Sequence, residues 1–119
     1  MSHSDPIVFS PERIYAEFLA RGSEWADAEA AASLLDEGKK PMLAKLKIAA
    51  PGKTEAAKET EALGHPDYSE YIREMVNARH KANKARVAYD AVKVLADMRR
   101  SEHATRRAEM TFVQGGSAG

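Results

Sequence analysis

A cluster of basic side chains near the C-terminus is the feature of this sequence best suited to bind a ligand. The cluster consists of Arg99, Arg100, His103, Arg106 and Arg107, and it is preceded by Lys81, Lys84, Arg86 and Lys93. Clustered Lys and Arg attract a polyanion by releasing its counterions, without needing contacts to bases. We therefore take as candidate nucleic-acid-binding residues Arg99, Arg100, Arg106, Arg107, Lys81 and Lys84.

Two other interpretations of this cluster remain open, because charge is unevenly distributed along a chain whose net charge is zero. Residues 12–37 carry two basic and seven acidic side chains, whereas residues 73–107 carry ten basic and four acidic ones. An acidic segment lying alongside a basic one would neutralise it and fix the orientation of the two. An acidic protein partner is the third interpretation.

No other residues have a spacing that predicts chemistry. The histidines at 3, 65, 80 and 103 are scattered, and no His-Glu-x-x-His motif occurs. There is no Gly-rich phosphate loop before a helix and no carboxylate pair suited to acid-base catalysis. Cysteine is absent. We expect no enzymatic activity, no catalytic residue, no metal and no cofactor.

The elements that must position the basic cluster are two long helices. Apolar residues recur at alternating steps of three and four from Tyr68 to Ala96, and a second such stripe runs from Trp25 to Ala49. This spacing is typical of helices that pack against each other. The interface residues expected from the two stripes are Trp25, Leu35, Met42, Leu46, Tyr71, Met75, Tyr89 and Val92. Tyr68, Tyr71 and Tyr89 could also stack on bases, but their heptad spacing favours the core.

Capping and breaking residues set the expected boundaries. Ser10 and Pro11 begin the first helix, which we expect to bend or break at Gly22-Ser23 and to continue, kinked, through Gly38 and Pro41. A short helix follows at 55–63, and the long helix runs from 66 to about 112. The expected organisation is a flexible N-terminus (1–9), one helical-hairpin domain (10–113) and a flexible C-terminal tail (114–119).

The predicted fold is all-α, a long antiparallel coiled-coil-like hairpin with a short connecting helix and two matched arms of about forty residues. A hairpin this thin buries one stripe per arm, which is too little to offset chain entropy without a second contact. We expect a homo-oligomer, with the second contact made by flanking residues Leu34, Leu43, Ile72, Val76, Val87, Leu95 and Met98. No membrane-spanning apolar run or signal peptide is present, which predicts a soluble intracellular protein with no membrane partner.

Several stretches together resemble a family of small helical-hairpin proteins encoded by bacteriophages and prophages. They are Trp25 to Leu34, Lys39-Lys40, Ala44 to Leu46, Thr54 to Glu59, Glu61 to Leu63, Pro66 to Tyr71, and Arg99 to Glu109. The resemblance covers about residues 21–109, and its most specific part is the connector with the Pro66-Asp67-Tyr68 helix start. Gly38 and Pro41 depart from it, standing where good helix formers are expected.

Many members of that family are encoded beside single-strand annealing recombinases and single-strand binding proteins. The resemblance therefore implies an accessory role in phage DNA recombination or replication, in the cytoplasm of a bacterial host cell. The partners it implies are single-stranded DNA, a recombinase or a single-strand binding protein. The alternative hypothesis is a structural or regulatory coiled-coil adaptor that does not contact nucleic acid.

Overall fold

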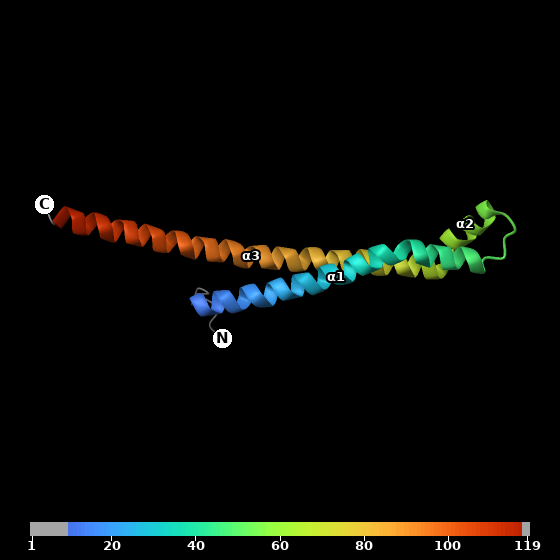
Figure 1. Ribbon diagram of the computed structural model, residues 1–119, viewed down its shortest axis with the longest axis horizontal. Helices are drawn as coiled ribbons and strands as arrows, with labels where there is room; N and C mark the ends of the chain where they lie inside the picture. The colour runs from blue at the N-terminus through green and yellow to red at the C-terminus, as the bar shows by residue number, and fades with distance from the viewer. Residues whose placement is uncertain (1–9, 118–119) are drawn as a thin grey trace, which may run out of the picture.

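The chain folds into three helices arranged as a long hairpin (Figure 1). A computed structural model describes residues 10–117, and side chains through residue 113. Helix α1 spans Pro11–Ala49, α2 spans Glu55–Leu63 and α3 spans Pro66–Ser117. Within the described residues the remainder is connecting turns, so the predicted all-α hairpin with a short connecting helix is confirmed. The expected N-terminal segment, 1–9, lies outside the described residues.

The helices begin where the capping residues predict. Ser10 Oγ accepts a hydrogen bond from the Arg13 amide at 3.2 Å, and Thr54 Oγ1 accepts one from the Ala57 amide at 3.1 Å. Each of these bonds satisfies a backbone donor that the first turn of a helix leaves free. At the start of α3 the Asp67 amide donates instead to His65 Nδ1, at 3.0 Å.

Helix α1 is continuous over its 39 residues, with Pro41 inside it. The predicted continuity through Gly38 and Pro41 is confirmed. Of the bend or break expected at Gly22-Ser23, the break is absent. A Cβ atom at Gly22 would lie 3.5 Å from Cε2 of Tyr89 on the facing helix. Gly22 therefore lies inside the packed interface between α1 and α3, which we call the seam. Contacts between the two helices there outweigh the weak helix propensity of glycine.

The connection between α1 and α2 is held by two side-chain contacts. Lys47 Nζ lies 2.6 Å from Glu55 Oε1, which ties the end of α1 to the start of α2. Glu61 Oε2 accepts a hydrogen bond from the Gly52 amide at 2.9 Å. Since these contacts bind α2 to the end of α1 and to the turn between the two helices, the connector is a structured turn.

The two arms run antiparallel in one register. The Tyr71 hydroxyl donates to the Leu35 carbonyl at 2.5 Å, and the Tyr89 ring packs against Phe18 and Trp25 with centroids 5.2 Å from each. The buried centre of the seam is made of alanines. It comprises Ala28, Ala32 and Ala82, with Ala78 and Ala85 packed against them.

All eight predicted interface residues lie half-buried along this seam. Tyr71 and Tyr89 are among them, with their rings between the helices, so the core interpretation of these two tyrosines is confirmed. Their partial exposure follows from the architecture, since a two-helix hairpin has no third element to cover the rims of the seam.

The arms are unequal, contrary to the expected match of about forty residues each. Helix α3 has 52 residues against 39 in α1, and it continues four residues into the expected tail. No proline interrupts it, and no described glycine has the positive φ that commonly ends a helix. Phe18 of α1 contacts Tyr89 of α3. Pro11, two helical turns before Phe18, is therefore level with Ala96, two turns after Tyr89. Residues 100–117 therefore extend about 27 Å past α1 as a single helix, which we call the arm.

Large apolar side chains remain exposed along the hairpin and the arm. Among the expected flanking residues Leu34, Val76, Val87 and Met98 are exposed, while Leu43, Ile72 and Leu95 are half-buried. No helix in the described part of the chain has the length and apolarity needed to cross a bilayer.

Candidate nucleic-acid interface

The predicted nucleic-acid-binding residues fall into two separate places on α3. Lys81 and Lys84 lie on the paired part of the hairpin, beside Glu24 and Asp27 of α1. Arg100, Arg106 and Arg107 lie on the arm, where every described side chain from residue 100 onward is exposed. At 1.5 Å per residue, Lys84 is about 24 Å from Arg100, so the structure does not gather the six into one patch.

Arg99 marks the boundary between hairpin and arm. Its side chain is 32% exposed, and its Nη1 lies 3.8 Å from Glu102 Oε2 of the same helix. Its Nε is buried and has no hydrogen-bond partner among the described residues. Arg99 is therefore partly enclosed, and it is the member of the cluster least free to bind a ligand.

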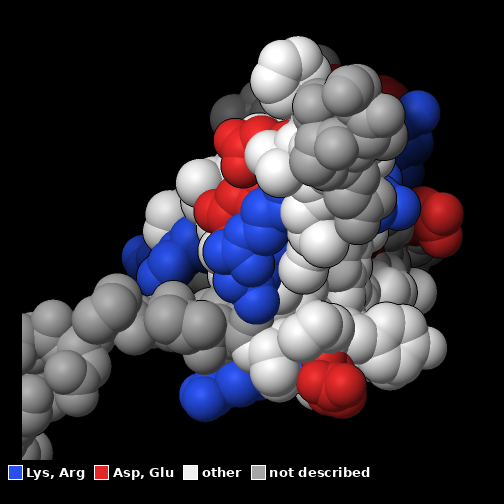
Figure 2. All heavy atoms as spheres, turned by 90° about the vertical axis from the view of Figure 1, so that its left-hand side faces the viewer, with Lys and Arg blue, Asp and Glu red and all other residues white. Residues whose placement is uncertain are grey.

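Neutralisation across the seam does not reach the arm. The acidic segment of α1 begins at Glu12, level with the last half-buried turn of α3, so Arg100, Arg106 and Arg107 have no α1 residue beside them. None of the three forms an ion pair within the described residues. Viewed from the end of the arm, Lys and Arg lie on several sides of the molecule with Asp and Glu between them (Figure 2).

One line of basic residues does continue from the hairpin onto the arm. It consists of Arg79, Arg86, Lys93, Arg100 and Arg107, each seven residues after the last. Seven residues are close to two helical turns, so these side chains share one side of α3 at intervals of about 10.5 Å. We call these five residues the basic line.

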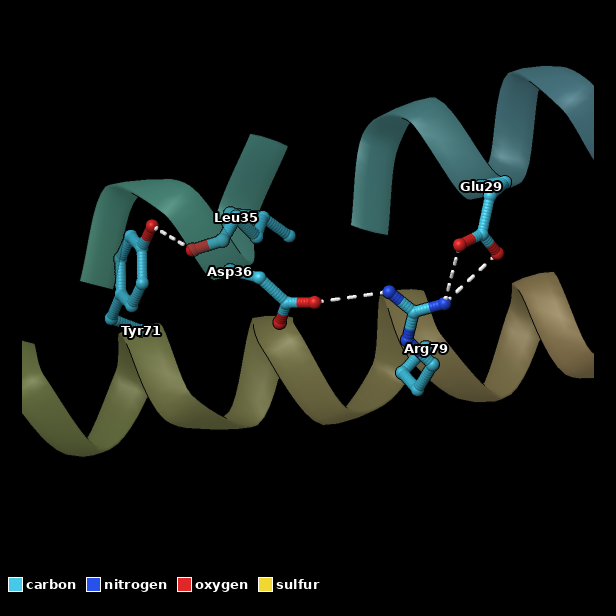
Figure 3. Close-up of polar contacts among 5 residues, drawn as sticks. All are labelled: Glu29, Leu35, Asp36, Tyr71 and Arg79. Atoms are coloured by element: carbon cyan, nitrogen blue, oxygen red, sulfur yellow. Dashed lines mark hydrogen bonds and ion pairs between the residues drawn. The ribbon is translucent and has the colours of Figure 1, made fainter. Parts of the chain in front are cut away.

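Helix α1 presents carboxylates to only the first member of the basic line. Arg79 Nη1 lies 2.9 Å from both carboxylate oxygens of Glu29, and its Nη2 lies 3.0 Å from Asp36 Oδ2 (Figure 3). The hydrogen bonding to Glu29 and, after it, that to Asp36 raise the pKa of Arg79 above its ordinary value. Here the predicted charge neutralisation between α1 and α3 does occur, at a residue outside the predicted site.

Towards its N-terminus, the side of α1 that faces the basic line has no further acidic residue. Counting back by sevens from Asp36 gives Glu29, Gly22 and Tyr15, so beyond Glu29 it offers no carboxylate. The four later members of the basic line, Arg86 to Arg107, are exposed and form no ion pair within the described residues. Asp90 and Asp97 stand three or four residues from Arg86, Lys93 and Arg100 on α3, yet they pair with none of them.

An aromatic side chain accompanies this open part of the basic line. Tyr15 is 66% exposed. It lies three residues before Phe18, which contacts Tyr89, and Lys93 lies four residues after Tyr89, so Tyr15 and Lys93 are at about the same level of the hairpin. Seven-residue spacing from the Glu29–Arg79 pair predicts that they share one side of it. An exposed ring beside spaced cations is the combination that single-strand binders use to stack bases and hold phosphates.

Charge counting along the sequence found Arg86 and Lys93 but left both out of the predicted site, and it missed Tyr15. The regular seven-residue interval was the signal available for the first two. Tyr15 had no such signal, because its position relative to Lys93 depends on the register between α1 and α3.

The described residues contain no group of three or more His, Asp or Glu side chains arranged to hold a metal ion. Comparison with known proteins found no matching family model, no matching curated protein and no matching solved structure.

Proposed function

We propose that this chain is a non-enzymatic accessory protein that binds single-stranded DNA along Arg86, Lys93, Arg100 and Arg107. The observation that carries the proposal is that these four cations are exposed, evenly spaced and without an ion-pair partner in the described part of the chain. They extend over about 31 Å, which suits an extended polyanion better than a compact ligand.

The biological setting is proposed from the resemblance to phage and prophage hairpin proteins. In that setting the chain assists DNA recombination or replication in a bacterial cytoplasm, beside a single-strand annealing recombinase or a single-strand binding protein. The exposed apolar residues of the hairpin, such as Val87 and Val94, suit contact with such a protein partner.

The test is fluorescence anisotropy with a labelled oligothymidylate over a range of salt concentrations. We expect binding that weakens with salt, with a slope of log affinity against log salt near −3 for four phosphate contacts on a single strand. Changing Arg86, Lys93, Arg100 and Arg107 to Ala should abolish measurable binding. Changing Arg99, Arg100, Arg106 and Arg107 should weaken it less, because that set spares Arg86 and Lys93.

The matched control removes the same charge elsewhere. Lys39, Lys40, Lys45 and Lys53 are exposed at the opposite end of the molecule and form no ion pair within the described residues. Their replacement by Ala should leave the salt slope unchanged. An equal loss in both quadruple variants would show only a net-charge effect.

Absence of binding by the unaltered protein at 50 mM salt would favour the second candidate function, a coiled-coil adaptor without nucleic-acid contact. The exposed apolar residues favour that function independently of the basic line, because unpaired apolar surface on a helix commonly marks a protein contact.

A further inference from the structure

A groove runs along the seam on the side away from the basic line. It has a volume of about 510 Å³. Its floor is formed by alanines of α1 and α3, at positions 28, 31, 78, 85 and 88. Because alanine projects little beyond the backbone, another helix can approach such a floor closely.

The two rims of this groove carry opposite charge. Glu24 and Asp27 form the α1 rim, and Lys81 and Lys84 form the α3 rim. Glu24 accepts a hydrogen bond from Arg21 of its own helix, whereas Asp27, Lys81 and Lys84 form no ion pair within the described residues. The acidic and basic rims face each other across the groove at the same level of the hairpin but do not pair.

Exposed apolar side chains extend both rims. Leu34 lies seven residues after Asp27 and is 71% exposed, and Met98 lies fourteen residues after Lys84 and is 56% exposed. The heptad spacing puts each on the same side of its helix as the charged residue. This side of the hairpin therefore combines apolar surface with a self-complementary pair of charged rims.

We propose that a second copy of this chain occupies the groove, related by a two-fold axis parallel to the helices. That rotation places α1 of each copy over α3 of the other. The acidic rim, Glu24 and Asp27, then meets the second copy's Lys81 and Lys84, and the same contact repeats on the other side of the axis. A two-fold axis perpendicular to the helices would instead set acidic rim on acidic rim, which like-charge repulsion disfavours.

The product is a four-helix bundle in which the arms of both copies, residues 100–117 of each, project from the same end. Lys81 and Lys84, predicted from sequence as nucleic-acid contacts, become dimer contacts in this arrangement. This inference is independent of the proposed DNA binding, since none of the four rim residues belongs to the basic line.

The first experiment uses charge reversal and sedimentation equilibrium. The unaltered protein should be a dimer at 20 µM. The double variants E24K/D27K and K81E/K84E should each be monomeric, because each makes both rims alike in charge. An equimolar mixture of the two should form a heterodimer, and the quadruple variant that combines the four changes should dimerise again. The matched control, K39E/K40E, should remain a dimer.

Monomeric unaltered protein, or dimerisation that neither double variant weakens, would overturn the proposal. Circular dichroism of each variant checks whether helicity is retained, and recovery of dimer in the mixture separates loss of the contact from loss of the fold.

The second experiment tests the orientation. A spin label on T105C, in a chain that has no other cysteine, reports the distance between the two arms. With packed helices 8–10 Å apart, we expect a label separation of roughly 20–40 Å. The antiparallel dimer would separate the labels by about 60 Å, because residue 105 lies about 30 Å along α3 from the centre of the groove. A distance near 60 Å would contradict the parallel arrangement.

Discussion

Arg79 links helices α1 and α3 electrostatically, since it bonds to Glu29 and Asp36 together. Replacing it with Ala should lower the melting temperature by a few degrees at low salt, and by less in 1 M salt, where screening weakens exposed ion pairs. Arg86→Ala is the matched control, because it removes the same charge seven residues on, where α1 offers Gly22. Equal effects of the two substitutions on thermal melting would show that the contacts of Arg79 add nothing beyond net charge.

Gly38 is the second residue whose role can be tested, because a Cβ atom there would overlap the Tyr71 hydroxyl oxygen. The Tyr71 ring is held in place by its bond to the Leu35 carbonyl, so Gly38→Ala should destabilise the fold despite gaining about 1 kcal/mol of helix propensity. In a Tyr71→Phe background the same change should stabilise it, since Cζ lies at an ordinary 3.5 Å.

Gly22→Ala serves as the control for that comparison, measured by urea unfolding. The nearest atom to its added Cβ is Tyr89 Cε2 at 3.5 Å, so the substitution should stabilise by about 0.5–1 kcal/mol. Stabilisation by Gly38→Ala in the unaltered background would contradict the assigned role of Gly38 in making room for the Tyr71 hydroxyl.

At the scale of elements, the helix starts and the connector were predictable because local chemistry decides them. Ser10, Thr54 and the Ala50-Pro51 stop act through their own or neighbouring backbone groups. The break that we considered at Gly22 does not occur, because the weak helix propensity of glycine is a local cost, whereas the Tyr89 ring that Gly22 accommodates belongs to α3. Whether a glycine breaks a helix thus depended on a contact that no local pattern contains.

The α1–α2 connection should depend on pH through Lys47 and Glu55. Their hydrogen bond lowers the pKa of Glu55 below its ordinary 4.5 and raises the pKa of Lys47 above 10.5. A lowered carboxyl pKa stabilises the fold above pH 4.5, and the contribution is lost as pH falls through the lowered value. On the alkaline side, the contribution is complete below pH 10.5 and disappears as pH rises through the raised pKa of Lys47.

An NMR titration of the Glu55 side-chain carboxyl carbon checks this link. In the Lys47→Met variant the Glu55 midpoint should move up towards 4.5, because its nearest cation is gone. A midpoint unchanged by that substitution would show that the two side chains are not paired in solution, and that Gly52 and Glu61 alone hold the connector.

At the scale of the whole molecule, sequence predicted that charge is polarised but not where it is left unpaired. Arg79 and Arg100 are both members of the same seven-residue repeat, so sequence spacing does not distinguish them. They differ because α1 begins level with Ala96, which leaves Arg79 beside two carboxylates and Arg100 beside none. The lengths of α1 and α3 and the register between them decide which residues of the basic line have no carboxylate of α1 beside them.

The arm gives the last prediction, tested with a chain that ends at Arg99. Because residues 100–113 are exposed throughout, removing the arm should leave the melting temperature unchanged within about a degree, while the helical circular dichroism signal falls in proportion to the residues lost. Affinity for oligothymidylate should fall, since Arg100 and Arg107 are removed and Arg86 and Lys93 remain. A melting temperature that drops, and does so more at low protein concentration, would instead mean that the two arms of a dimer pack on each other.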